Sequence, residues 1–102
     1  MEIIIKEISS PLKSKYSDFE GIYFFGSRAS GSHEEDSDYD LLFAFGREID
    51  WKFEKEITAV IYDFMLEYDV IIDCKIYSHS EILDPVTPFR ENVKKEGIFY
   101  GS

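Results

Sequence analysis

Two apolar runs separated by a polar loop dominate the first half of the chain. Residues 21–25 and 39–45 are rich in aromatic and aliphatic side chains, the composition of buried β-strands. Gly26 stops the first run, and Gly46 ends the second. The pattern therefore predicts two buried strands, with the last residues of the loop at the mouth of a sheet.

A long amphipathic helix is predicted next, from Asp50 to about Tyr68. Its apolar positions recur with a period of 3.6 residues and form one stripe: Phe53, Ile57, Val60, Ile61, Phe64 and Tyr68. Asp50 is suited to the N-cap, because a short acidic side chain accepts a hydrogen bond from the free backbone N–H groups there. Residues 69–77 then predict a third strand.

The N-terminal segment carries a weaker helical pattern. Three apolar residues recur at helical spacing: Ile4, Ile8 and Leu12. Pro11 is unfavourable inside a helix, because it lacks an N–H donor and its ring collides with the preceding turn. We therefore expect a short helix that begins at Pro11, with Ser10 as its N-cap, and ends near Tyr16.

The C-terminal segment predicts two short helices. A brief one near residues 80–83 would be capped by Ser78 or Ser80, and a second runs from Phe89 to about Glu96. Helices thus flank the predicted strands on both sides along the chain. This order predicts an α/β (α+β) fold in which helices flank a small mixed sheet.

Composition and charge narrow the class of protein. Hydrophobic residues make up 44% of the chain and aromatic residues 17%, which is enough for a core and excludes intrinsic disorder. No repeat or linker divides the sequence, so we expect one domain over residues 1–102. Eleven basic against 21 acidic residues give a formal net charge of −10, so we expect no direct binding to DNA or RNA.

Cellular location follows from cysteine usage and apolar run length. The single cysteine, Cys74, cannot form an internal disulfide, which favours a reducing compartment. No apolar run approaches the ~20 residues that span a bilayer, and no signal-peptide pattern opens the chain. We therefore expect a cytoplasmic protein with no membrane segment.

Acidic residues gather at the end of the polar loop. From His33 to Asp40 the sequence is HEEDSDYD, with five carboxylates in eight positions. Such a run is usually a solvated loop, but this one leads straight into the predicted strand 39–45. Asp38 and Asp40 would then project to the same side about 6–7 Å apart, a spacing that lets both bind one or two divalent cations.

A Gly-Ser turn precedes this acid pair. Gly26 and Ser27 directly follow the first predicted strand, and ten residues separate them from Asp38. A turn of this kind exposes backbone N–H groups and a hydroxyl, which can bind phosphate oxygens. Divalent cations held by carboxylates beside a phosphate site suit in-line attack on a nucleotide phosphate. The two features together predict nucleotide chemistry.

The segment 24–45, FFGSRASGSHEEDSDYDLLFAF, resembles the signature of the minimal nucleotidyltransferases, the smallest members of the DNA polymerase beta-type superfamily. The closing stretch TPFRENVKKEGI is similar to the C-terminus of one branch of these proteins. The resemblance implies that Gly26 and Ser27 contact the phosphates of ATP, and that Asp38 and Asp40 hold Mg²⁺ in a two-metal site.

One basic residue, Arg28, directly follows the Gly-Ser pair. We expect it to contact phosphate. The family often carries a second basic residue nearby, where this chain has Ser30.

The resemblance also implies a third carboxylate from a later strand, which Asp69 or Asp73 could supply. If both lie on one strand they share a face, because side chains alternate with period two, and they stand roughly 13 Å apart. Only one can then join Asp38 and Asp40. We expect Asp69 as catalytic residue and metal ligand, because it opens the predicted strand and matches where this branch carries Asp before an apolar triplet. Asp73 would instead pair with Lys75.

The function that the resemblance implies is AMP transfer from ATP to a tyrosine hydroxyl of a HEPN-domain toxin, with this chain as the antitoxin. Two alternatives stay open: an antitoxin that only binds its toxin, and a transferase for small molecules, which would need a further domain or a dimer. The acceptor, the nucleotide and the homo- or hetero-oligomeric state are also open. With 17% aromatic residues we expect an exposed partner surface, on helix 50–68 or the segment from Pro88.

Overall fold

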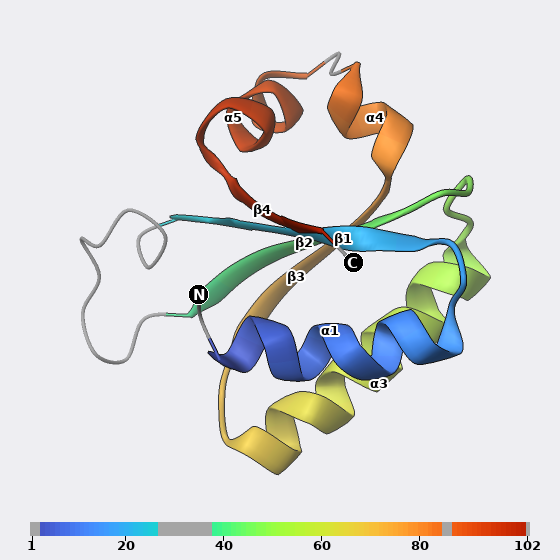
Figure 1. Ribbon diagram of the computed structural model, residues 1–102, viewed down its shortest axis with the longest axis vertical. Coiled ribbons are helices and arrows are strands. Elements are labelled where there is room, and N and C mark those ends of the chain that lie inside the picture. The colour runs from blue at the N-terminus through green and yellow to red at the C-terminus, as the bar shows by residue number, and fades with distance from the viewer. Residues whose placement is uncertain (1–2, 27–37, 85–86, 102) are drawn as a thin grey trace.

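In the computed structural model, which describes residues 3–26, 38–84 and 87–101, one sheet lies between two layers of helices (Figure 1). The elements in chain order are α1 (Ile3–Lys15), β1 (Phe19–Phe25), β2 (Tyr39–Phe45), α3 (Trp51–Tyr68), β3 (Ile72–Ser78), α4 (His79–Leu83), α5 (Pro88–Glu96) and β4 (Ile98–Gly101).

The sheet has four strands in the order β3-β2-β1-β4. β1 pairs antiparallel with β2 on one side and with β4 on the other. β2 and β3 are parallel, because α3 carries the chain back along the sheet between them. The predicted α/β class with a small mixed sheet is therefore confirmed.

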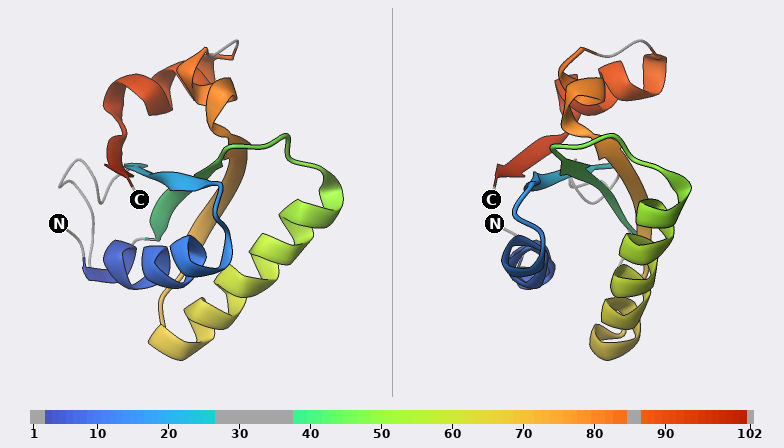
Figure 2. Two further views of the ribbon diagram at one scale, coloured as in Figure 1. Left: turned by 45° about the vertical axis from the view of Figure 1, so that its right-hand side comes forward. Right: turned by 90° about the vertical axis from the view of Figure 1, so that its right-hand side faces the viewer.

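Helices α1 and α3 cover one face of the sheet (Figures 1 and 2). The larger part of the core lies between them and the sheet, where α1 and α3 both bury an apolar stripe. β2 contributes Leu41, Phe43 and Phe45 to this layer, all fully buried. The stripe of α3 meets them through Phe53, Ile57, Ile61 and Phe64.

Helices α4 and α5 lie against the opposite face (Figures 1 and 2). A smaller cluster forms there from Tyr23, Leu42, Ala44, Ile82 and Val93. Since both faces of β2 are covered, its residues from Leu41 to Phe45 form a continuous apolar run instead of alternating with polar ones.

The first helix is longer than the sequence pattern predicts. α1 spans Ile3–Lys15 with Pro11 inside it, so the prediction of a helix that begins at Pro11 is wrong. Proline removes one backbone hydrogen bond. The helix continues across it because Ile5, Ile8 and Leu12 are all buried against the sheet, and their packing outweighs the lost bond.

The third strand begins later than predicted. Asp69 has left-handed backbone angles (φ 52°, ψ 49°) and closes α3, with its N–H donating to Met65 O. β3 begins only at Ile72. The last strand, β4, was not predicted; its four residues pair with β1 from Phe24↔Ile98 to Gly21↔Gly101. Of the helices in the described residues, none is long and apolar enough to cross a bilayer.

Candidate active site

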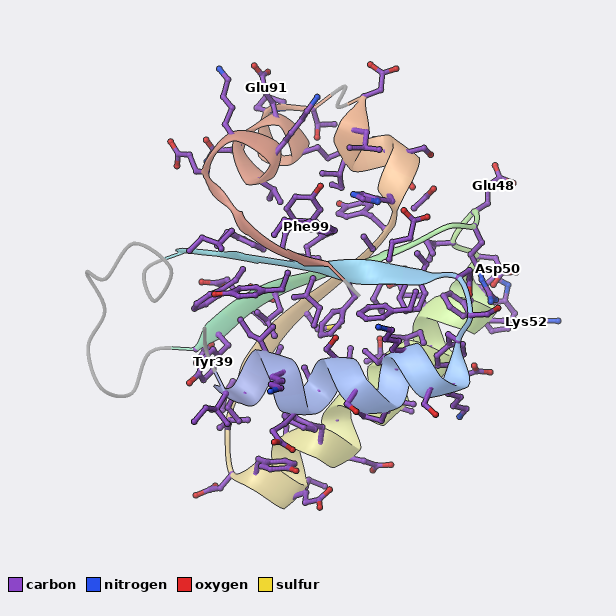
Figure 3. The ribbon with its side chains drawn as sticks, viewed as in Figure 1. Tyr39, Glu48, Asp50, Lys52, Glu91 and Phe99 are labelled. Atoms are coloured by element: carbon purple, nitrogen blue, oxygen red, sulfur yellow. The ribbon has the colours of Figure 1, made fainter. Side chains whose placement is uncertain are left out.

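The candidate site lies at the end of the sheet where β1 ends and both β2 and β3 begin. Tyr39 marks this end in Figure 3, while Glu48 and Asp50 lie beyond the other end of β2. Asp40 occupies the centre of the site. It lies opposite Phe25 of β1 and opposite Asp73 of β3 in the strand register.

Alternation along the strands decides which face carries the acids. Asp40 has the same parity as Leu42 and Ala44, which pack in the cluster on the α4 and α5 side. On β3, Asp73 has the same parity as Tyr77, which packs against that same cluster. The two carboxylates therefore project from the same face of adjacent strands.

Burial and neighbouring negative charge both raise the pKa of Asp40. Partial burial is the largest cause, followed by the negative charges of Asp73 and Asp38 and by a hydrogen bond with Asp73. Lys75 acts in the opposite direction. Its Nζ lies 3.5 Å from Asp73 Oδ1, so the salt bridge expected between these two residues is present.

Gly26 lies directly against Asp40. Its backbone is left-handed (φ 80°), and a Cβ at this position would lie 2.7 Å from Asp40 Cγ, inside van der Waals contact. Only glycine fits both the backbone angle and the space. Gly26 and Asp40, named separately from the sequence, are therefore neighbours in space.

The acids proposed from the sequence are not all brought together. Asp38, Asp40 and Asp73 interact, whereas Asp69 is exposed at the C-cap of α3. The expectation that Asp69 and Asp73 share a strand face is wrong, because the left-handed turn at Asp69 ends the helix three residues before β3 begins. The structure places Asp73 beside Asp40. Ser27 and Arg28 lie outside the described residues.

Lys75 also lies at this site. From the sequence it was expected only to pair with Asp73 and not to bind nucleotide. Its parity with Asp73 on the strand was the signal that could have placed it there. It adds one positive charge beside three carboxylates. Phosphate contacts by Lys are common in nucleotide sites, so the residue is suited to a triphosphate as well as to Asp73.

The carboxylates of Asp38, Asp40 and Asp73 suit a divalent cation such as Mg²⁺, because carboxylate oxygens are the protein ligands that this ion prefers. A cation between Asp40 and Asp73 would offset the repulsion that raises the pKa of Asp40. Within residues 3–26, 38–84 and 87–101, no three acidic, histidine or cysteine side chains converge tightly enough to hold a metal by themselves. Phosphate oxygens and water would therefore complete the shell, as is usual for Mg²⁺.

Most of this chain is similar to a known protein family and to two known sequences. The model of the family described as polymerase beta, nucleotidyltransferase, matches residues 6–98. Two proteins of Methanocaldococcus jannaschii, both provisionally named protein adenylyltransferases, are similar over most of the chain. One is 30% identical over 93 residues, which is 91% of this chain and 87% of the relative. The other is 32% identical over 98 residues, which is 94% of this chain and 93% of the relative.

Solved structures with the same fold include a nucleotidyltransferase from Sulfolobus solfataricus, with a TM-score of 0.65 and 23% identity over 95% of this chain and 76% of that one. A toxin–antitoxin structure determined with AMP-PNP has a TM-score of 0.68 and 19% identity. The match covers 95% of this chain and 73% of that one. The toxin–antitoxin MntA-HpeT has a TM-score of 0.66 and 16% identity. The match covers 95% of this chain and 72% of that one. At these identities the likeness supports the fold.

Proposed function

Because this chain belongs to the polymerase beta nucleotidyltransferase family, we propose that it is a Mg²⁺-dependent protein adenylyltransferase that transfers AMP from ATP to a tyrosine hydroxyl of a HEPN-domain toxin. In this role it is the antitoxin of the pair. The two relatives named as protein adenylyltransferases support a protein acceptor. The toxin–antitoxin structures, one of them with an ATP analogue, support the nucleotide and the kind of partner.

The observation that carries the proposal is the position of Asp40. It lies between Gly26, which ends β1, and Asp73, which begins β3, with Asp38 two residues before it. Carboxylates thus converge from two strands beside the turn that the sequence analysis assigns to phosphate binding. A carboxylate cluster at a phosphate site is the arrangement that nucleotidyl transfer needs.

In the proposed reaction, Asp38 and Asp40 hold Mg²⁺, and Asp73 completes the site in place of Asp69. The bound ion supplies positive charge that offsets the charge of the attacked α-phosphate and of the leaving pyrophosphate. Gly26 and Ser27, with Arg28, bind the phosphates through N–H groups, hydroxyl and guanidinium. Lys75, whose Nζ lies 3.5 Å from Asp73 Oδ1, is close enough to the site to contact a phosphate oxygen.

The chemical step is a displacement at phosphorus. The acceptor hydroxyl oxygen forms a bond to the α-phosphorus, the bond from that phosphorus to the bridging oxygen breaks, and pyrophosphate leaves. The hydroxyl proton passes to a carboxylate oxygen of Asp73, which acts as the general base. The products are an adenylylated tyrosine and pyrophosphate.

The test uses the protein encoded in the reading frame beside this chain's own. Both proteins are purified, mixed with ATP and Mg²⁺, and the partner is analysed by mass spectrometry for AMP on a tyrosine. The double variant Asp38→Asn with Asp40→Asn is the control, and it should bind the partner without modifying it. A wild-type chain that binds the partner and leaves it unmodified would contradict the proposal and favour an antitoxin that acts by binding alone.

A further inference from the structure

The outward surface of α3 carries three large exposed apolar side chains. Trp51 is 71% exposed, Tyr62 58% and Leu66 69%. They lie at helical spacing on the face opposite the buried stripe of the same helix. Trp51 and Tyr62, with Ala59 between them in the sequence, line a hollow of about 490 Å³. Large aromatic side chains around a hollow are typical anchors of protein interfaces.

A second hollow, of about 220 Å³, continues this surface onto the sheet. Its floor is the edge strand β3, from Cys74 to Tyr77, and it shares Glu54 and Thr58 with the first hollow. We call the combined surface the α3–β3 flank; it comprises Trp51, Glu54, Thr58, Tyr62 and Leu66 of α3 and residues 74–77 of β3.

The flank leads directly to the candidate active site. Asp73 immediately precedes Cys74 on the edge strand, and Lys75, which lines the second hollow, pairs with Asp73. Asp73 and Lys75 project from the α4 and α5 side of β3, whereas the flank lies on its α3 side, so the two meet at the edge strand, where Lys75 also lines the second hollow. A partner segment that is seated on the flank and reaches round this edge would come to the carboxylates. Leu83, an exposed apolar residue of α4, lies outside this surface, because α4 covers the opposite face of the sheet.

We propose that the α3–β3 flank is the surface on which the protein acceptor of AMP docks, an inference that rests on the proposed function. The matching surface of the acceptor presents apolar side chains bordered by Lys and Arg. The charge of this chain supports that chemistry, because it is −10 overall and α3 carries four acidic residues against two basic ones, Lys52 and Lys55, of which Lys55 lines the first hollow. A second copy of the chain is disfavoured, since it would bring two surfaces of strong negative charge together.

The test measures binding of the protein from the neighbouring reading frame by calorimetry, separately from AMP transfer. The double variant Trp51→Glu with Tyr62→Glu should weaken the affinity at least ~10-fold, because two anchor side chains are replaced by charges. Its KM for the acceptor should rise by the same factor, while the Kd for ATP with Mg²⁺ is unchanged. Leu83→Glu is the control: it places one glutamate at another exposed apolar position and should leave both quantities unchanged.

An unchanged affinity in the double variant would overturn the inference. If the double variant lowers the thermal midpoint, Ala59→Arg replaces it, because an arginine there fills the hollow and must weaken binding equally. A wild-type dimer that the double variant dissociates would assign the flank to a second copy and also overturn it. Failure of the wild type to bind the partner would overturn the docking surface together with the proposed function. Binding without AMP transfer contradicts the proposed function alone and leaves the docking surface standing.

Discussion

The carboxylate of Asp40 fills the space into which any side chain at position 26 would project. Gly26 has φ 80°, and an added Cβ would lie 2.7 Å from Asp40 Cγ. The two residues are fourteen positions apart in sequence; Gly26 directly follows β1, and Asp40 lies in the antiparallel neighbouring strand β2. The glycine of the turn therefore also sets the position of the carboxylate.

Replacement of Gly26 by alanine should impair both folding and catalysis. The left-handed backbone costs a residue with a side chain about 1–2 kcal/mol, and the new methyl group must displace the Asp40 carboxylate. Urea denaturation should show the loss of stability, and AMP transfer should fall below a tenth of the wild-type rate. Gly101→Ala is the control, because its Cβ meets only Phe99 Cε2 at 3.4 Å. Full activity of the Gly26→Ala chain would show that the Asp40 position is not critical.

Asp40 should destabilise the metal-free chain at neutral pH. Burial and the charges of Asp73 and Asp38 raise its pKa in the folded state, so its ionised form is disfavoured by folding. Stability should therefore fall as pH rises from the unfolded-state pKa of about 3.9 through the higher folded-state pKa. In EDTA at pH 7, Asp40→Asn should unfold at a higher temperature than the wild type.

The stabilising effect of Asp40→Asn should shrink as pH falls from 7 through the folded-state pKa toward ~4, and it should be lost below ~4, where Asp40 is protonated in both states. Thermal unfolding of the variant and the wild type, monitored by circular dichroism across pH 3.5–7, measures this difference in stability. The exposed Asp63→Asn controls for the removal of one charge from an acidic chain. A gain at pH 4 as large as that at pH 7 would be inconsistent with like-charge repulsion at Asp40.

ATP should bind only together with a divalent cation. Without one, the phosphates meet the charges of Asp38, Asp40 and Asp73, with Lys75 as the positive charge at the described part of the site. At a hundredfold excess over Kd, Mg²⁺ with ATP should stabilise the chain by about 2.7 kcal/mol, and ATP in EDTA should leave the midpoint unchanged. Equal stabilisation in EDTA would argue against metal bridging.

The sequence predicts the central elements of this fold well, because each has a strong local pattern. The strand at residues 39–45 and the helix from residue 51 to Tyr68 agree with the structure, and Asp50 caps the helix by accepting a hydrogen bond from Phe53 N at 2.8 Å. The short helix that follows Ser78 and the one that ends at Glu96 are also confirmed.

The elements that the sequence misplaces depend on tertiary contacts. α1 continues through Pro11 because its apolar stripe packs on the sheet, which no local pattern reports. β4 is four residues long and exists through its pairing with β1. The left-handed conformation of Asp69 separates it from β3, so parity alone could not choose the third carboxylate. The register pairs Asp40 with Asp73, which supports Asp73 as the proposed third carboxylate.

The most direct test of the account compares AMP transfer by two single variants, Asp73→Asn and Asp69→Asn, with the partner protein, ATP and Mg²⁺. Asp73 lies beside Asp40, whereas Asp69 is exposed at the end of α3. The account predicts that Asp73→Asn loses transfer at least ~10²-fold, the usual contribution of a general base, while Asp69→Asn retains the wild-type rate. Full transfer by Asp73→Asn together with none by Asp69→Asn would contradict the assignment of the active site to the Asp40–Asp73 pair.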